Sequence, residues 1–430
     1  MPRFIAPHRT KFVVAGAVVL TLAGVLLAVN FMSGEKKIER RIERLYALDH
    51  PLFTHQLGVL LGPQFVDGNR ATVLRNGDQI FPAMLAAIGS ARRSISFETY
   101  IYWSGDIGRE FAHALAERSR AGVKTHVLLD WVGSAKIDQD LLDEMEAAGV
   151  QIRKFHPPHW SNLGRMNNRT HRKLLVVDGQ TAFTGGVGIA PQWTGQAQDP
   201  DHWRDTHFQV DGPVVAQMQA VFLDNWIKVT GDVLHGPDYF PALEPAGRAL
   251  AQMFSSSPSG GSESMQLMYL MAITAASRSI DLSASYFVPD DLTTNALVEA
   301  IKRGVKLRIV VPGEHIDSET VRSASRARWG PLLAAGAVIA EYQPTMFHCK
   351  VMIVDGLLVS VGSTNFDNRS FRLNDEATLN VIDADFAREQ TAIFEADLSL
   401  ARPITYAQWR KRPWRDRFAE RLASVIGSQL

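Results

Sequence analysis

One short pattern occurs twice in this chain and limits what it can fold into more than any other feature does. In each copy a histidine is followed two residues later by a lysine, and five residues after that by an aspartate. The two copies consist of His171, Lys173 and Asp178, and of His348, Lys350 and Asp355. The residues after each lysine, LLVVD and VMIVD, are typical of a buried strand, on which residues two apart point to the same side. Each copy therefore predicts a histidine and a lysine that face one side together.

The segments around the two copies repeat as well. AGVKTHVLLD precedes the first copy, RGVKLRIVVPG precedes the second, and each is followed by an apparent helix and a further short apolar run. Short β-branched or aromatic runs that alternate with amphipathic stretches of about 10 to 15 residues are typical of βαβ units. The prediction is an α/β protein of two repeated lobes, whose mostly parallel sheets pack around one shared active site.

The repeat divides the chain into segments. Residues 71–235 form the first predicted lobe and residues 263–400 the second. Between them, residues 236–262 are rich in proline, serine and glycine, which is typical of a connection. The flanking segments are an apolar anchor at 1–34, a charged amphipathic connector at 35–70 and a basic amphipathic tail at 401–430.

An uncharged apolar run extends from Phe12 to Met32. About 20 such residues suffice to cross a hydrocarbon core as a helix, so we expect one transmembrane helix. The competing interpretation is a cleaved signal peptide, because basic residues precede the run, but the run is longer than the apolar region of a usual signal peptide. More Lys and Arg residues follow the run closely than precede it, which favours a cytoplasmic position for the rest of the chain.

Charge and cysteine content exclude several classes of protein. The 45 Lys and Arg residues balance 45 Asp and Glu residues, which argues against a protein held on nucleic acid by its overall charge. The single cysteine, Cys349, excludes an internal disulfide and a cysteine-cluster zinc site. The tail at 401–430 is nevertheless basic and contains Trp409, Trp414 and Phe418. Such a tail either meets anionic lipid headgroups or packs on the body as an amphipathic helix.

A histidine and a lysine supplied twice suit phosphoryl transfer without a metal ion. Neutral imidazole can attack phosphorus or exchange a proton with an alkoxide, and lysine offers positive charge to the phosphoryl oxygens. Two histidines are needed because the nucleophile and the acid must lie on opposite sides of the phosphorus. We therefore expect His171, Lys173, His348 and Lys350 to share one site, with no metal and no cofactor. Asp178 and Asp355 end the motifs, where a turn-stabilising role is as plausible as a chemical one.

Residues downstream extend the predicted site. Ser363 and Asn365 follow a glycine in VGSTNFDNRSF and could donate hydrogen bonds to phosphate oxygens. Alignment of the last strands of the two halves superposes Glu376 on Asp205. An acid in matching places of both lobes could accept the Nδ1 proton of a catalytic histidine and so leave Nε2 free for phosphorus.

The paired motifs, together with FETYIYW, HWRDTHFQVDGPVV, YFVPDD and GSTNFDNRSF, closely resemble the phospholipase D superfamily, and specifically its bacterial cardiolipin synthase branch. The resemblance covers roughly residues 70 to 415. One departure is that Gly186 and Gly188 occupy in the first lobe the places of Ser363 and Asn365 in the second. Backbone N–H groups of these glycines could replace the missing side-chain contacts to phosphate.

The resemblance implies transfer of a phosphatidyl group between two phosphatidylglycerol molecules, giving cardiolipin and glycerol. It implies that His171 forms a phosphatidyl-histidine while His348 protonates the departing glycerol, although the near symmetry of the motifs would permit the reverse. Expected partners are phosphatidylglycerol, other anionic phospholipids and the membrane, with no nucleic acid. The expected location is the bacterial inner membrane, with a single membrane span and a cytoplasmic catalytic body; no oligomeric state is predicted.

Two other functions compete with this one. A membrane-bound phospholipase D or another phosphodiesterase, including a nuclease, would use water as the acceptor and share all six motif residues. An inactive lipid-binding scaffold is the weaker alternative, because both motifs are intact. Aromatic residues near the motifs could contact acyl chains or glycerol, or belong to the core. These residues are Tyr100, Tyr102, Trp103, His159 and Trp160.

Overall fold

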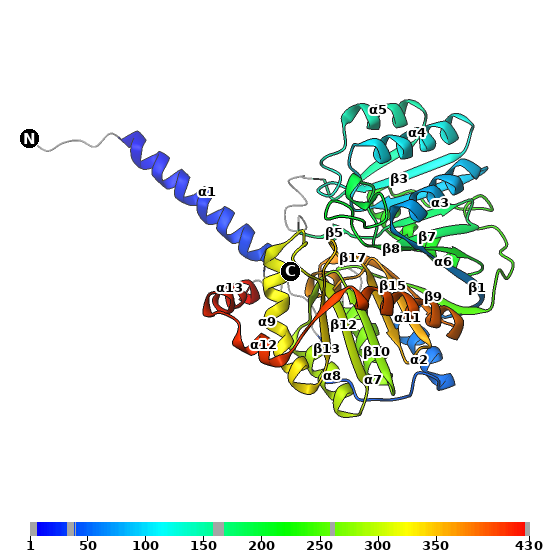
Figure 1. The fold of residues 1–430 in the computed structure, drawn as a ribbon. Helices are drawn as coiled ribbons and strands as arrows, with labels where there is room; N and C mark the ends of the chain where they lie inside the picture. Colours follow the sequence, from blue (N-terminus) through cyan, green and yellow to red (C-terminus); the bar gives the residue numbers. More distant parts are fainter. Residues whose placement is uncertain (1–6, 32–37, 39, 158–166, 259–262, 426–430) are drawn as a thin grey trace, which may run out of the picture.

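The computed structural model describes residues 7–31, 38, 40–157, 167–258 and 263–425 (Figure 1). The chain folds as two copies of one α/β unit, as the sequence repeat predicts. The first copy comprises β1 (Val66–Arg75), α3 (Asn76–Ser90), β2 (Ser94–Thr99), α4 (Asp106–Arg120), β3 (Lys124–Asp130), α5 (Gln139–Ala147), β4 (Gln151–Phe155), β5 (Arg169–Thr170), β6 (Leu174–Val177), β7 (Thr181–Gly185), β8 (Thr206–Asp211) and α6 (Val215–Thr230).

The described second copy has the same order except that it adds β11, β16 and the short helix α10 and has no counterpart of β5. It comprises β9 (Ala249–Ser256), α7 (Glu263–Ala275), β10 (Ser279–Ala284), β11 (Phe287–Val288), α8 (Asp291–Lys302), β12 (Lys306–Pro312), α9 (Glu319–Ala335), β13 (Val338–Tyr342), β14 (Lys350–Val354), β15 (Leu358–Gly362), β16 (Phe366–Asp367), α10 (Asn368–Arg372), β17 (Asn374–Ile382) and α11 (Ala384–Ser399). The motif strands β6 and β14 therefore hold equivalent places.

Most strands of both copies belong to one 16-stranded sheet within the described part of the chain. Its order is palindromic: β4-β3-β2-β6-β7-β8-β1 in the first copy meets β9-β17-β15-β14-β10-β12-β13 in the second, and β18 (Ala401–Ile404) adds to the far edge. The two copies join where β1 and β9 pair antiparallel, with Val66 opposite Ala251.

The prediction of mostly parallel sheets is wrong. Only β2-β3-β4 and β10-β12-β13 are parallel runs in the main path of the sheet, and their strands are connected through helices. The motif strands instead pair antiparallel with both neighbours, as β6 does with β2 and β7. A parallel neighbour requires a long crossover, whereas the chain after each motif turns back within a few residues.

Two strands lie where the sequence predicts connections. β1 begins at Val66, inside the predicted connector 35–70, and β9 lies inside the predicted connection 236–262. The β9 sequence ALAQMFSS has no β-branched residue and so gives little local signal for a strand. It is extended because β1 and β17 pair with it on both sides.

A buried apolar cluster holds the two copies together. Leu174 and Phe208 from the first copy pack in one cluster with Val351 and Leu379 from the second. Helices α6 and α11 contribute to this cluster. One further cluster lies under the helices of the first lobe and another under those of the second. The contact between lobes is therefore a hydrophobic core, which fixes their relative position.

The N-terminal helix α1 (Pro7–Phe31) extends away from the body (Figure 1). Among the residues that the structure describes, no helix combines the length and the apolar character that a membrane crossing requires. The predicted transmembrane helix, and with it the predicted single-pass arrangement, is not supported.

The C-terminal tail packs on the body. Helices α12 (Tyr406–Lys411) and α13 (Trp414–Val425) lie against α9. The indole N–H of Trp409 donates to the carbonyl of Arg326 at 2.7 Å, and Ala423 is buried beside Val321 and Ala324 of α9. This agrees with one of the two interpretations of the tail, that of an amphipathic helix packed on the body.

Candidate active site

Each motif histidine lies in a short segment that a backbone hydrogen bond connects to the opposite lobe. His171 lies between β5 and β6, and its N–H donates to the carbonyl of Asp375 at 2.9 Å. His348 precedes β14, and its N–H donates to the carbonyl of Arg204 at 2.8 Å. The positions of both histidines therefore depend on the contact between the lobes.

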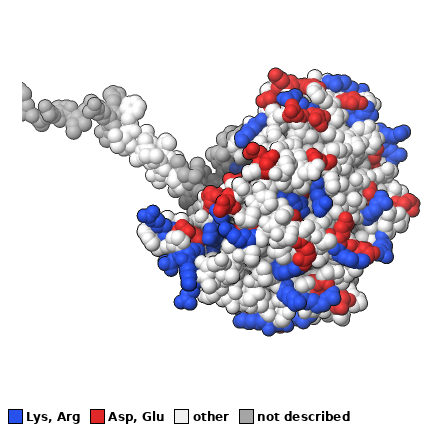
Figure 2. Space-filling model, in the orientation of Figure 1, with Lys and Arg blue, Asp and Glu red and all other residues white. Residues whose placement is uncertain are grey.

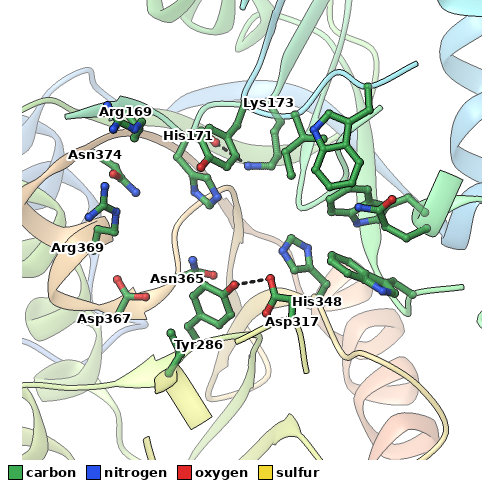
Figure 3. Close-up of a pocket in the computed structure, with 17 residues that line it drawn as sticks. Arg169, His171, Lys173, Tyr286, Asp317, His348, Asn365, Asp367, Arg369 and Asn374 are labelled. Atoms are coloured by element: carbon green, nitrogen blue, oxygen red, sulfur yellow. Dashed lines mark hydrogen bonds between the residues drawn. The ribbon is translucent and has the colours of Figure 1, made fainter. Parts of the chain in front are cut away.

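The two histidines face a cavity of about 630 Å³ (Figure 3). Residues of both lobes line it: Tyr100, Ile101, Trp103, Arg169, His171, Lys173, Gln192, Trp193, Trp203, Tyr286, Asp317, Val321, His348, Asn365, Asp367, Arg369 and Asn374. A cavity of this size, with a few polar groups that converge on it, is typical of a small-molecule or headgroup site.

His171 is held by an acid of the other lobe. Its Nδ1 donates to Glu376 Oε1 at 2.9 Å and lies 3.1 Å from Oε2. The Glu376 carboxylate is completely buried and also accepts hydrogen bonds from Ser363 at 2.5 Å, Ser370 at 2.7 Å and Asn374 at 3.2 Å. With the carboxylate fixed by these donors, the imidazole presents Nε2 to the cavity.

His348 has the reciprocal arrangement. Its Nδ1 donates to Asp205 Oδ2 of the first lobe at 2.7 Å. Asp205 is buried and also accepts hydrogen bonds from the Trp193 indole at 3.0 Å and the Thr206 N–H at 2.7 Å. The rings of Trp193 and Trp203 lie 5.3 and 5.5 Å from the His348 ring. The two acids that sequence alignment superposes are thus exchanged between the lobes.

The two motif lysines lie beside the histidines. Lys173 Nζ donates to the His171 carbonyl at 2.8 Å, and Lys350 Nζ donates to the His348 carbonyl at 2.8 Å and to Ser285 Oγ at 2.9 Å. Burial, and the charge of the other lysine, lower the pKa of Lys173 to about 7. Burial also lowers the pKa of Lys350. An anion in the cavity would favour the charged form of both amines.

Burial determines the protonation of the histidines. It lowers the pKa of His171 to about 4, although Glu376 opposes this shift. Burial and the Lys350 charge likewise lower the pKa of His348. Burial alone would raise the pKa values of Glu376 and Asp205, yet the histidine that each contacts holds its pKa below the usual value. The resting site therefore has two neutral imidazoles, each on an ionised carboxylate.

The structure does not bring Asp178 and Asp355 to the cavity. Both lie at the other end of the motif strand, in turns with φ of 54° and 55°. Each carboxylate accepts hydrogen bonds from three consecutive backbone N–H groups. The donors are those of Arg92, Arg93 and Ser94 for Asp178, and those of Ser277, Arg278 and Ser279 for Asp355. The geometry gives both aspartates a role in the fold, because none of these groups lies at the histidines.

Of Ser363 and Asn365, which were both predicted to contact phosphate, only Asn365 lines the cavity. The Ser363 hydroxyl donates to Glu376, so it belongs to the support of His171 and does not face the cavity. Asn365 does line the cavity, and its Oδ1 accepts a hydrogen bond from Ser285 at 2.6 Å. Of these two residues, Asn365 is the one placed to contact a phosphate.

Close packing explains why positions 186 and 188 hold glycine. A Cβ at Gly186 would overlap the Asp205 carboxylate, and one at Gly188 would contact Ile101 and Trp193. The Gly186 N–H donates to the Thr206 carbonyl at 3.1 Å, so it is not directed at a phosphate. The predicted phosphate contact through Gly186 is wrong, because packing around Asp205 explains the glycine.

Several residues that line the cavity were not predicted from the sequence. Of the aromatic residues singled out there, Tyr100 and Trp103 line the cavity, Tyr102 is buried in the core, and His159 and Trp160 lie outside the described residues. The remaining polar lining residues are Gln192 and six that Figure 3 labels: Arg169, Asn374, Arg369, Asp367, Tyr286 and Asp317. Most of them lie within a few residues of His171, Asn365 or Glu376 in the sequence. This closeness along the chain was the signal that could have identified them.

A metal-binding cluster is not part of this site. In the ranges that the structure describes, no three His, Cys, Asp or Glu side chains are grouped so that they could hold a metal ion.

Two similar α/β lobes, each with a His–Lys pair and with both histidines facing one cavity, define the class of two-lobed phospholipase D-like proteins. The family described as "Cardiolipin synthase, PLD-like domain" matches residues 84–226 and 269–398. A cardiolipin synthase of Geobacillus kaustophilus is 35% identical over 395 residues, which is 90% of this chain and 78% of that protein. Cardiolipin synthase A of Pseudomonas syringae is 35% identical over 83% of this chain and 74% of that protein. The chain belongs to the cardiolipin synthase family of phospholipase D-like proteins.

A solved structure shows the same fold. Phosphatidylserine synthase of Haemophilus influenzae superposes with a TM-score of 0.67 over 88% of this chain and 100% of that chain, at 12% sequence identity. Polyphosphate kinase of Porphyromonas gingivalis superposes with a TM-score of 0.51 at 13% identity. At these identities the similarity concerns the fold alone.

Proposed function

We propose that this protein is a cardiolipin synthase, which transfers a phosphatidyl group from one phosphatidylglycerol to a hydroxyl group of another. The observation that carries this proposal is the pair of imidazoles, His171 and His348, which face one cavity from opposite lobes, each in contact with a buried carboxylate. Cardiolipin synthase relatives at 35% identity over most of their length support the substrate class.

In the first step, His171 Nε2 attacks the phosphorus of the donor lipid. A phosphorus–nitrogen bond forms, the bond from phosphorus to the glycerol oxygen breaks, and His348 gives its proton to that oxygen. In the second step the neutral His348 takes a proton from a hydroxyl of the second phosphatidylglycerol. That oxygen attacks phosphorus from the side the glycerol left, and the bond to His171 breaks.

The charges around the site fit this sequence of steps. His171 must be neutral to attack, and its low pKa keeps it so. His348 must be protonated to act as an acid; a bound phosphodiester anion, with Asp205, favours that form. Lys173, Lys350 and Asn365 are the groups placed to hold the non-bridging oxygens as charge develops.

The test uses the purified full chain with phosphatidylglycerol as the sole lipid. The expected products are cardiolipin and glycerol in equal amounts. Phosphatidic acid in place of cardiolipin would make the protein a hydrolase, and the absence of turnover would leave a lipid-binding protein. Trapping of the labelled adduct assigns the roles: if His171→Ala still forms it and His348→Ala does not, the two histidines are exchanged.

We also propose that α13 binds the surface of an anionic membrane. Its outward side carries Trp414, Phe418 and Leu422, which are 67%, 59% and 57% exposed. Residues four apart lie on one side of a helix, so these three form an apolar stripe. Aromatic and leucine side chains in this position enter the boundary between headgroups and acyl chains.

Positive charge surrounds this stripe. The exposed basic residues of α12 and α13 are Arg410, Lys411, Arg415, Arg417 and Arg421, whereas Asp416 is the exposed acid of α13. Glu420 is buried and paired with Arg412. Figure 2 shows these basic side chains gathered over α12 and α13, on the side from which α1 extends. A groove of about 600 Å³ at these helices is lined by Arg410, Arg417 and Arg421 and by Trp414 and Phe418, among other residues.

The position of α13 connects this surface with the active site. Ala423 packs with Val321 of α9, and Val321 lines the active-site cavity. A bilayer bound by α13 would therefore lie near the cavity that must receive two lipids.

Sedimentation with vesicles tests the membrane proposal. Replacement of Trp414, Phe418 and Leu422 by serine should lower the fraction of full-length protein bound to phosphatidylglycerol vesicles by about tenfold, and added salt should weaken wild-type binding. A matched control replaces three exposed apolar residues of α2 (Pro51–Leu61) by serine: Leu52, Val59 and Leu60. Equal losses in the two triple variants, or no loss in the first, would overturn the proposal.

A further inference from the structure

Two carboxylates, those of Asp317 and Asp367, line a cavity that otherwise suits an anion. Asp317 lies in the loop between β12 and α9, one residue before Ser318, which caps α9. It lines the cavity, and its Oδ2 accepts a hydrogen bond of 2.5 Å from the Tyr286 hydroxyl (Figure 3). Tyr286 lies just before β11 and also lines the cavity, so the two side chains form a fixed pair in its wall.

The pair lies on the side of the cavity that His348 occupies. Figure 3 shows the Asp317 carboxylate next to the His348 ring, whereas His171 lies across the cavity. Asp317 is close enough to oppose, by its charge, the lowering of the pKa values of His348 and Lys350 that burial causes. In the proposed reaction, His348 protonates the alcohol that leaves and deprotonates the alcohol that attacks.

The chemistry of the pair limits what it can bind. A carboxylate repels a phosphodiester, so Asp317 does not hold the reacting phosphate. It accepts hydrogen bonds from hydroxyl groups, and a bond to a charged acceptor is stronger than one between neutral groups. The headgroup of phosphatidylglycerol offers two hydroxyls: one that reacts and an adjacent one that does not.

We propose that Asp317, oriented by Tyr286, binds the non-reacting hydroxyl of the glycerol group and so selects polyols over water and simple alcohols as acceptors. This inference rests on the proposed function and names a specificity-determining residue for it. His348 then receives the reacting hydroxyl in line with phosphorus, because the neighbouring hydroxyl is already held. Water, which lacks the second hydroxyl, gains nothing from this contact.

The experiment is a competition for one phosphatidyl-enzyme. The full chain is given phosphatidylglycerol together with deuterated glycerol and 1-propanol, and mass spectrometry measures the ratio of deuterated phosphatidylglycerol to phosphatidylpropanol. The ratio of initial rates depends only on the second step, because both products arise from the same intermediate and little deuterated phosphatidylglycerol has yet been consumed as a substrate. Any general damage to His348 or to folding lowers both products together.

The expected result is a fall of the glycerol-to-propanol ratio by about tenfold in Asp317→Asn, which removes the charge of the acceptor. Tyr286→Phe should lower the ratio in the same direction and provides a second variant with a smaller change. Glu314→Gln is the matched control, since Glu314 is an exposed acid of the same loop that does not line the cavity.

The outcomes separate the two proposals. An unchanged ratio in Asp317→Asn, or an equal change in Glu314→Gln, overturns the role of Asp317 while the transferase function stands. Failure of the wild-type protein to form either phosphatidyl alcohol overturns the proposed function itself.

Discussion

His171 of the first lobe donates its Nδ1 proton to Glu376 of the second lobe at 2.9 Å, and His348 of the second lobe donates to Asp205 of the first at 2.7 Å. Neither lobe therefore contains a complete histidine–carboxylate pair. Each pair forms only when the buried cluster between the lobes is assembled. The two halves of the chain form one site, because each half supplies the carboxylate that holds the histidine of the other half.

Replacement of Glu376 by Gln should abolish most of the activity and leave the fold intact. The amide keeps the shape but loses the charge that orients His171 and stabilises its protonated and phosphorylated forms. We expect kcat to fall by about 100- to 10,000-fold. Steady-state assays with phosphatidylglycerol measure the loss. Glu389→Gln, an exposed acid of α11, is the control, and a full-rate Glu376→Gln enzyme would contradict the role of the pair.

The imidazole of His171 should remain neutral to unusually low pH. Burial disfavours the charged ring, so its pKa falls from the ordinary 6.5 to about 4. The ¹⁵N chemical shifts of the ring, assigned by comparison with His171→Gln, should therefore show the neutral form at pH 5.5. Binding of inorganic phosphate should move the titration upward, because the anion stabilises the imidazolium. A ring that titrates near 6.5 without phosphate would contradict this assignment.

Replacement of Asp178 by Ala should affect stability rather than chemistry. Its carboxylate accepts hydrogen bonds from three successive backbone N–H groups at the start of β2, and the loss leaves these donors unpaired. We expect the free energy of unfolding to fall by about 2–4 kcal/mol. Chemical denaturation measures this change, with the exposed Asp140→Ala as control. A variant of normal stability whose kcat has dropped 100-fold would instead show a chemical role.

Gly186→Ala should disturb His348 from a distance. The added Cβ would overlap the Asp205 carboxylate, which must then move away from Nδ1 of His348. We expect a loss of activity of about 100-fold or more, comparable with that of Asp205→Asn. The double variant should be no worse than the single ones, because both remove one interaction. Gly89→Ala is the control, since a Cβ there meets nothing within 4 Å; additive losses would contradict this explanation.

The sequence alone identified the repeat, the α/β class and the four motif side chains, of which His171, Lys173 and His348 line the cavity and Lys350 lies beside His348. These follow from local rules: strand alternation places His171 and Lys173 on one side, and the spacing recurs in the second half. The same rules predicted parallel sheets and missed β9, whose sequence carries almost no local strand signal. They left Asp178 between a chemical and a turn-stabilising role, whereas the structure places it at the opposite end of its strand, on three backbone N–H groups.

What only the tertiary structure decided is the pairing between distant groups. Alignment placed Asp205 and Glu376 at equivalent positions, but it could not show that each serves the histidine of the other lobe. That exchange results from the pairing of β1 with β9, which joins the two halves of the sheet, and from the buried cluster between the lobes. Within the second lobe, the pairing of β15 with β17 places Ser363 against Glu376, and the loop before α9 brings Asp317 next to His348. Local sequence specifies which chemistry each strand carries, whereas burial of apolar surface between the lobes specifies which groups meet.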